Sequence, residues 1–124
     1  MDKAHWHASQ IDFGNAYQMV RMFERNRLDG VTQTQLDVLM ELYRSHPSPL
    51  MMKVLCLSTH CAESTLRGVM KGLIERDLIV PTELQDSRAR CFKLTRTALM
   101  QLRQYQALVV SAYGMFHQPQ EGSK

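Results

Sequence analysis

The chain has 124 residues, of which 44% are hydrophobic and 22% charged, and its formal net charge is +3 at pH 7. These values are typical of one folded domain and exclude wholesale disorder, and 6 Gly with 4 Pro exclude a collagen-like or linker-rich chain. The longest near-apolar stretch, residues 107–116, is too short to span a bilayer, and no secretory signal is visible, so we expect a cytoplasmic protein without a membrane partner.

The first predicted helix covers residues 5–28. Its apolar residues recur at spacings of three and four, which is the period of an amphipathic helix. They are Phe13, Ala16, Tyr17, Val20 and Phe23. Asp29-Gly30 ends this helix, because glycine readily adopts the left-handed conformation that closes a helix.

Two further helices are predicted in the middle of the chain. Thr32 begins the first of them, and Gln35, three residues later, completes the pattern of a capping box. Residues 46–49 then break the chain. Ser48 is predicted to cap the next helix with Pro49 in its first position, where a missing N–H costs nothing.

The fourth predicted helix runs from about residue 63 to residue 77. One side is apolar at a regular spacing of three and four, and the other side is small, polar or basic in its first half. Residues 79–83 and 90–94 are then predicted to form a β-hairpin. Phe92 and Leu94 alternate with Cys91 and Lys93, so Cys91 is expected on the exposed face.

A last helix is predicted from its cap, Thr95, to Tyr113. Four helices, two strands and a final helix make a mainly α fold with a small β-hairpin, in the order of a winged helix-turn-helix. Such a core would hold the fourth helix by its apolar side and leave the opposite side free to enter a DNA major groove. The hairpin would project beside it, within reach of phosphates or the minor groove.

The positive charge lies in the second half of the chain. Residues 1–62 hold six Lys or Arg and six Asp or Glu, whereas residues 64–103 hold eight and four. A localised basic surface favours binding to a phosphate backbone. A solvated surface that happens to lack acidic residues would have the same composition, so charge alone does not separate the two.

Residues 31–102 resemble the multiple-antibiotic-resistance regulator (MarR) family of winged-helix transcription factors. The resemblance depends on the order and spacing of five segments. They are Val31-Thr32 with Gln35, Val38, Leu39 and Leu42; Ser64-Thr65-Leu66 with Val69, Leu73 and Ile74; Arg76-Asp77-Leu78-Ile79; Asp86-Ser87-Arg88-Ala89-Arg90; and Leu94-Thr95 with Ala98.

The resemblance implies a homodimer that binds a palindromic operator in double-stranded DNA, often as a repressor. By resemblance, the DNA contacts are Ser64, Thr65, Arg67, Gly68 and Lys71 on the recognition helix and Asp86, Arg88 and Arg90 on the wing. In the wing, Asp86 would orient Arg88 into the minor groove. The dimer contacts would come from the first and last helices, at Phe13, Tyr17, Val20, Leu102, Tyr105, Leu108, Val109 and Ala112.

The same resemblance divides the chain into four parts. These are a dimerisation helix at residues 1–30, a winged DNA-binding region at 31–94, a second dimerisation helix at 95–116 and a flexible tail at 117–124. Three positions depart from the family pattern: Ala62 replaces the usual Ser or Thr cap, Ser87 interrupts the paired basic residues, and Ala98 replaces a common Gly. The family normally adds a second C-terminal helix, so here the first and last helices would form the dimer alone or with another protein.

Several alternatives remain open from the sequence. A winged-helix module that contacts proteins, without specific DNA binding, is the main one, because this fold serves many functions. Gly68 would permit either close approach of DNA or packing of another helix. The three cysteines are too few and odd in number for a disulfide framework; Cys56 is expected to be buried, and a redox role is the weaker interpretation. No catalytic constellation, cofactor motif or metal site is found, so we predict no enzyme activity and leave open a small-molecule or protein effector.

Overall fold

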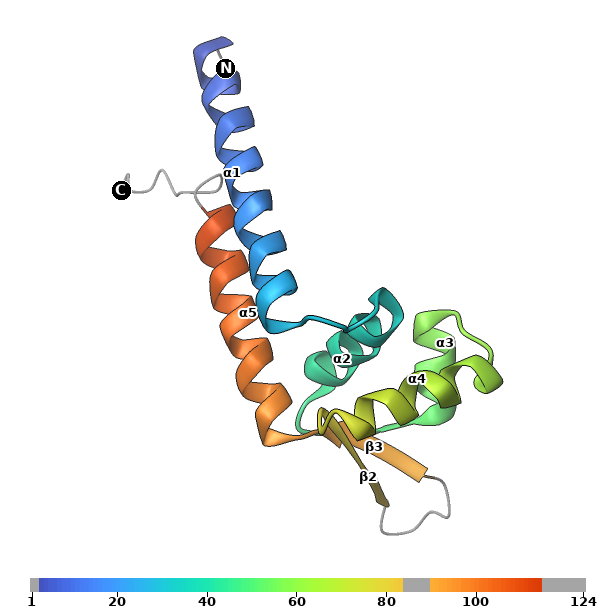
Figure 1. Ribbon diagram of the computed structural model, residues 1–124. Coiled ribbons are helices and arrows are strands. Elements are labelled where there is room, and N and C mark those ends of the chain that lie inside the picture. The colour runs from blue at the N-terminus through green and yellow to red at the C-terminus, as the bar shows by residue number, and fades with distance from the viewer. Residues whose placement is uncertain (1–2, 84–89, 115–124) are drawn as a thin grey trace. The chain divides into compact units, whose positions relative to one another are not determined.

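The computed structural model describes residues 3–83 and 90–114, with side chains from residue 10 onward. Two compact units divide the chain: Gly30–Leu102, here called the winged unit, and Met1–Asp29 with Arg103–Lys124, here called the helical pair. The elements in chain order are α1 (Lys3–Arg27), α2 (Gln33–Ser45), β1 (Leu50–Met51), α3 (Met52–Thr59), α4 (Glu63–Glu75), β2 (Ile79–Glu83), β3 (Arg90–Leu94) and α5 (Arg96–Gly114) (Figure 1). The predicted mainly α fold with a small hairpin is confirmed.

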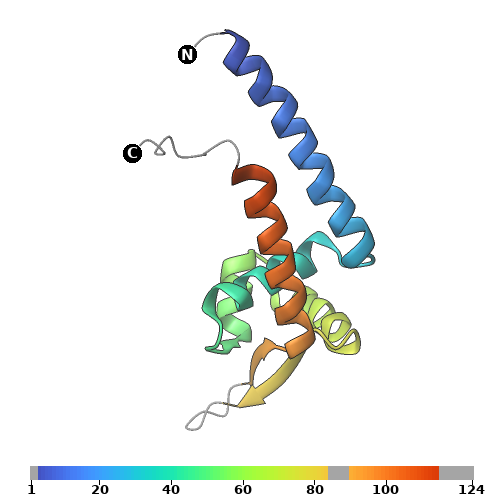
Figure 2. The same ribbon diagram turned by 90° about the vertical axis from the view of Figure 1, so that its left-hand side faces the viewer.

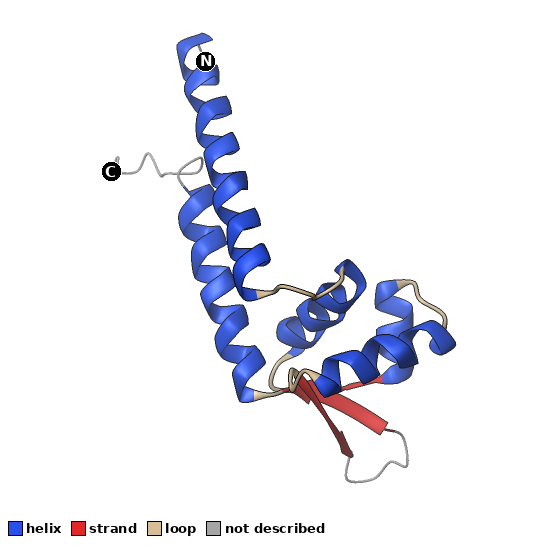
Figure 3. Ribbon diagram, in the orientation of Figure 1, coloured by secondary structure: helices blue, strands red, loops and turns tan. Residues whose placement is uncertain are grey.

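The winged unit packs α2, α3 and α4 against one another, with the sheet beside them (Figure 3). Its core is formed by aliphatic and methionine side chains that are at most 2% exposed: Val38, Leu39, Leu42, Leu55, Leu66, Met70 and Leu73. These residues recur at spacings of three and four in α2 and α4, so each helix buries one stripe and leaves the other side in solvent.

The capping box predicted for α2 is present. The Gln35 N–H donates to the Thr32 hydroxyl oxygen at 3.1 Å, and the Thr32 N–H donates to Gln35 Oε1 at 3.0 Å. Two main-chain donors at the helix start, which have no partner inside the helix, are thereby satisfied. The local sequence was sufficient to predict this cap because both partners lie within four residues.

The sheet has three antiparallel strands in the order β1-β3-β2. Strands β2 and β3 form the predicted hairpin, with Ile79 opposite Leu94 and Glu83 opposite Arg90, and they extend away from the helices of this unit (Figure 2). Both strands have the predicted bounds.

The third strand, β1, overturns the predicted start of the third helix. Leu50 pairs with Phe92 and Met51 pairs with Cys91, so both residues are extended and α3 begins only at Met52. Ser48 does not cap α3; the N-cap residue is Met51, without a side-chain cap bond. The pairing partner lies about 40 residues along the chain, and no local pattern could reveal it.

The same strand corrects the prediction for Cys91. This residue was expected to be exposed, yet it is 0% exposed. Because β3 is the middle strand, Cys91 lies between Met51 on one neighbouring strand and Thr82 on the other. Its small apolar side chain is enclosed there.

The helical pair joins α1 to the later part of α5 in antiparallel directions. Ala16, Val20 and Ala112 form its small buried core. Two ring contacts extend this core, with centroids 5.7 Å apart for Phe13 and Tyr113 and 5.5 Å apart for the stacked rings of Phe23 and Tyr105.

The helical pair also contains a polar cluster of Tyr105, Glu24 and Arg21. The Tyr105 hydroxyl donates a hydrogen bond to the Glu24 carboxylate, and Glu24 also forms an ion pair with Arg21 at 2.9 Å. Burial, followed by the hydrogen bond to Glu24, raises the pKa of Tyr105 well above its ordinary value. The phenol therefore remains a protonated donor throughout the physiological range.

Candidate nucleic-acid interface

Helix α4 presents a continuous outward surface. Its apolar stripe of Leu66, Met70 and Leu73 is buried. All five predicted recognition-helix residues lie on the exposed remainder: Ser64, Thr65, Arg67, Gly68 and Lys71. The recognition side is therefore not covered by any part of the chain that the structure describes.

The start of α4 has no side-chain cap, but it has an acidic residue in its first turn. Ala62, the N-cap residue, makes no side-chain cap bond. Glu63 occupies the first turn, where a carboxylate interacts favourably with the positive end of the helix dipole. Arg67 donates to this carboxylate at 2.7 Å, although both side chains are more than half exposed. A pair this exposed contributes little stability, so Arg67 can exchange Glu63 for a phosphate or a base at small cost.

The end of α4 is fixed by an unusual residue. Asp77 has a φ of 59°, in the left-handed region that favours glycine. The Asp77 N–H donates to the Ile74 oxygen at 2.9 Å, and the Leu78 N–H donates to the Leu73 oxygen at 3.0 Å. These two hydrogen bonds form a Schellman motif, which terminates a helix sharply. The motif sets the direction in which the chain continues into β2.

The two glycines of α4 differ in their surroundings. A Cβ atom on Gly72 would lie 2.7 Å from Nε2 of Gln35, so Gly72 leaves room for the capping box of α2. A Cβ atom on Gly68 would meet nothing within 4 Å. Close packing against another described helix therefore does not explain why position 68 is a glycine. Gly68 is exposed and directly follows Arg67 on α4.

A groove of about 920 Å³ lies between α4, the start of α3 and the sheet. Four basic residues line it, namely Lys53, Arg67, Lys71 and Arg90, with two acidic ones, Glu63 and Glu75. Its apolar lining is Met51, Met52, Met70, Ile74 and Phe92. The structure thus brings together two recognition-helix cations and one wing cation from the sequence prediction.

Lys53 is the member of this group that sequence reasoning missed. It belongs to the first turn of α3, and it reaches the groove because β1 positions this turn beside β3. Its charge was visible in the sequence, but only the pairing of β1 with β3 relates it to Arg90.

The wing is described in part. Arg90 is exposed at the first position of β3, opposite Glu83. The predicted contacts Asp86 and Arg88 lie outside the described residues, as does Ser87.

The predicted dimer residues fall into three groups by exposure: buried, half-buried and exposed. Val20 and Ala112 are buried in the helical pair and Leu102 is buried in the winged unit, at 8%, 5% and 2% exposed. Tyr105, Leu108 and Val109 are half-buried. Phe13 and Tyr17 are 56% and 52% exposed, and Ile11, Met22 and Val110 of the same unit are exposed to a similar degree.

No protein-family model and no curated protein matches this chain. Among solved structures, MepR of S. aureus bound to ethidium bromide has a TM-score of 0.80 at 13% identity, covering 99% of this chain and 87% of its own. A MepR–DNA complex of S. aureus has a TM-score of 0.66 at 16% identity, covering 94% and 90%. NadR in complex with 4-hydroxyphenylacetate has a TM-score of 0.64 at 16% identity, covering 93% and 77%.

These neighbours are regulators of the MarR family, and identities this low show a shared fold alone. The MarR-like winged-helix fold that the sequence predicted is confirmed. No helix among the described residues combines the length and the apolarity needed to cross a lipid bilayer.

Proposed function

We propose that this chain, whose fold is that of the regulators just compared, is a transcriptional regulator that binds double-stranded DNA sequence-specifically, acting as a homodimeric repressor. The observation that carries the proposal is the exposed side of α4 beside a groove with four basic residues. An α-helix fits the major groove of B-DNA, and the flanking cations fit the phosphates on either side.

The residues have different roles in this proposal. Arg67, with Ser64 and Thr65, reads base edges, because arginine can donate two hydrogen bonds to guanine. Lys71, Lys53 and Arg90 neutralise phosphates and set the register of α4. Asp86 and Arg88 of the wing complete the minor-groove contact, as the resemblance implies.

Homodimerisation is proposed through the helical pair. Five large apolar side chains of this unit are each at least 52% exposed, and an exposed apolar surface marks a protein interface: Ile11, Phe13, Tyr17, Met22 and Val110. Adding charge with Tyr17→Glu and Val110→Glu should convert dimer to monomer in sedimentation equilibrium. The control is Gln18→Glu with Ser111→Glu, which adds the same charge at adjacent exposed positions. A wild-type chain that sediments as a monomer would refute this part of the proposal.

An effector is proposed as well. Two of the structural neighbours are solved with a bound small molecule, ethidium bromide in MepR and 4-hydroxyphenylacetate in NadR. Their fold is shared by this chain, and on that ground we propose that a small molecule binds it as an effector. Ligand identity does not follow from fold.

DNA binding is tested by fluorescence anisotropy, with duplexes from the region upstream of this chain's own gene, across a salt series. The logarithm of the binding constant should fall linearly with that of salt concentration. Arg90→Ala should reduce this slope by about one, and Arg67→Ala should cost about 1–3 kcal/mol of preference for the bound sequence. Arg44→Ala is the matched control, because Arg44 also forms an exposed helical ion pair, with Glu41, on α2. Binding that ignores salt and survives both variants would exclude the proposal.

A protein-interaction module is the second candidate function. Leu57 of α3 is 72% exposed and Val54, one turn earlier, is 37% exposed, which makes an apolar strip on the winged unit. Purification from the host separates the two candidates. A stoichiometric protein partner without enriched DNA would favour the module, and enriched DNA would favour the regulator.

A further inference from the structure

The turn between α3 and α4 brings two cysteines together. α3 ends at Thr59, and the cap residue that follows, His60, has the left-handed angles φ 58° and ψ 36°. The Cys61 N–H then donates to the main-chain oxygen of Cys56 at 3.1 Å. In this type of helix end, the side chains of the two residues joined by that bond commonly contact each other.

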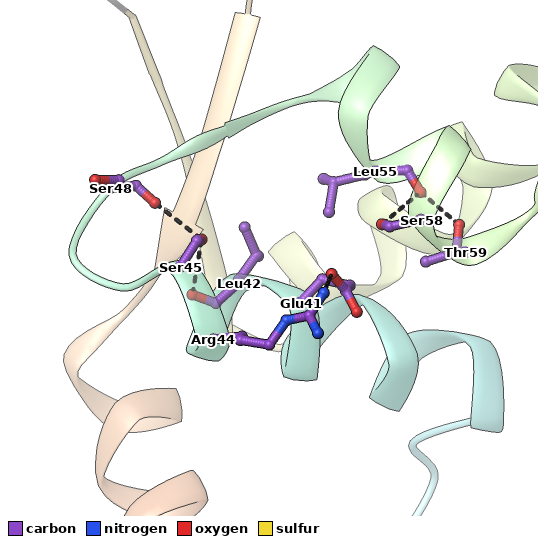
Figure 4. A network of polar contacts seen from close by, with 8 residues as sticks. All are labelled: Glu41, Leu42, Arg44, Ser45, Ser48, Leu55, Ser58 and Thr59. Atoms are coloured by element: carbon purple, nitrogen blue, oxygen red, sulfur yellow. Dashed lines mark hydrogen bonds and ion pairs between the residues drawn. The ribbon is translucent and has the colours of Figure 1, made fainter.

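The turn is held in this form by neighbouring side chains. The hydroxyls of Ser58 and Thr59 both donate to the main-chain oxygen of Leu55, at 3.3 and 2.6 Å (Figure 4). Leu55 is 0% exposed in the core of the winged unit. The closeness of Cys56 and Cys61 is therefore a feature of the packed helix end.

The separation suits a disulfide. Given the N–O distance of 3.1 Å, standard bond lengths place the two Cα atoms at most about 7.3 Å apart, and the bend at the carbonyl carbon lowers this limit to about 7 Å. Native disulfides span Cα separations of about 4.4–6.8 Å. Cys56 and Cys61 are both half-buried, so reagents can reach them. The prediction that Cys56 is buried is therefore wrong. Cys91 is fully buried in β3.

We propose that Cys56 and Cys61 form a dithiol that a peroxide oxidises to a disulfide within the chain. One thiolate attacks the O–O bond of the peroxide, which gives a sulfenic acid and water after proton uptake. The second thiolate attacks the sulfenic sulfur and expels hydroxide, which leaves as water. Two thiols thus lose two electrons and two protons, and hydrogen peroxide is reduced to two molecules of water.

This site lies outside the proposed DNA contacts, and the inference does not depend on DNA binding. It does bear on α4, because Cys61 immediately precedes the N-cap residue of that helix. The disulfide would close a ring of six residues, 56–61, across the turn of the helix-turn-helix.

The experiment is a peptide map of the purified, reduced chain after one equivalent of hydrogen peroxide and then trypsin. Cleavage after Lys53 and Arg67 yields one peptide, residues 54–67, that holds both cysteines, while Cys91 lies in a separate peptide, residues 91–93. We expect peptide 54–67 to resist iodoacetamide, to weigh two hydrogen atoms less, and to accept two labels after dithiothreitol. Cys91 should accept one label after unfolding, with or without peroxide.

Two variants sharpen the result. Cys61→Ser should leave Cys56 as a sulfenic acid that dimedone traps, and Cys91→Ala should close the 56–61 disulfide as the wild type does. The wild-type map alone decides the matter if either variant folds poorly. Two unchanged thiols in peptide 54–67, or a disulfide to Cys91 or to a second chain, would overturn the proposal.

Discussion

The hydroxyl of Thr95 binds the main chain of Asp77. Thr95 Oγ1 donates to the Asp77 oxygen at 2.7 Å and accepts from the Ala98 N–H at 3.1 Å. One side chain therefore caps α5 and also binds Asp77, the left-handed residue just after the end of α4. Because Asp77 is in the left-handed region, this bond also stabilises a conformation that aspartate adopts at a cost.

Thr95→Val should destabilise the winged unit by about 2 kcal/mol. Valine keeps the shape but loses a helix cap, at about 1 kcal/mol, and a hydrogen bond to a main-chain oxygen, at about 1 kcal/mol. Urea unfolding followed by circular dichroism measures the change. Thr97→Val, two residues later on the exposed side of α5, is the control and should cost much less. Equal losses for the two variants would contradict a capping role for Thr95.

Gly68→Ala should stabilise the chain and weaken DNA binding together. Alanine gains about 1 kcal/mol over glycine in a helix, and Gly68 has open space around it. The added methyl group lies on the proposed recognition side, where it would keep the backbone away from DNA. Gly14→Ala in α1, which is equally open, is the control for the gain in stability. A stabilised Gly68→Ala variant with unchanged affinity would show that DNA does not approach this position.

Glu63→Gln should strengthen DNA binding several-fold at low salt. The substitution removes a carboxylate that competes with phosphate for Arg67, and removes an acidic group from the groove. The free energy of unfolding should fall by roughly 0.3–1 kcal/mol, because a favourable negative charge leaves the first turn of α4. Glu41→Gln, which breaks the comparable pair with Arg44 on α2, is the control. Weaker DNA binding by Glu63→Gln would mean that Glu63 positions Arg67 for its contact.

Tyr105→Phe should reduce the loss of folding stability that the wild type shows at high pH. The pKa of Tyr105 is raised in the folded chain, so the protonated phenol stabilises the fold fully below the unfolded pKa of about 10, and this contribution is lost as pH rises above that value. Thermal unfolding at pH 7 and at pH 11 should therefore show a smaller drop for Tyr105→Phe than for the wild type. Tyr43→Phe, which removes a tyrosine hydroxyl from α2 of the winged unit and lies outside the proposed dimer surface, is the control and should behave like the wild type. Identical pH profiles for wild type and Tyr105→Phe would contradict the burial of this hydroxyl against Glu24.

Local pattern was sufficient wherever both partners of an interaction lie within a few residues. The capping box of Thr32 and Gln35, the cap of Thr95 and the amphipathic stripe of α4 all belong to this class. Periodicity also placed the predicted recognition residues on the exposed side of α4, because burial of Leu66, Met70 and Leu73 dictates which side remains outside.

Local pattern failed where the partner lies far along the chain. Leu50 and Met51 have the composition of a helix start, and only pairing with β3 makes them a strand. That pairing also encloses Cys91 and positions Lys53 beside the groove. The main-chain bond between Cys61 and Cys56 was equally hidden, because it depends on the left-handed conformation of His60, a residue that is not glycine.

From the sequence alone came the order of helices and strands, the caps and the outward residues of α4, since these follow from hydrophobic period and from bonds between near neighbours. The tertiary structure alone determined the third strand, the gathering of Lys53, Arg67, Lys71 and Arg90 around one groove, and the burial of Val20 and Ala112 inside the helical pair. The physical reason is that burial and strand pairing are properties of distant segments brought together, so their free energy is not contained in any local stretch of residues.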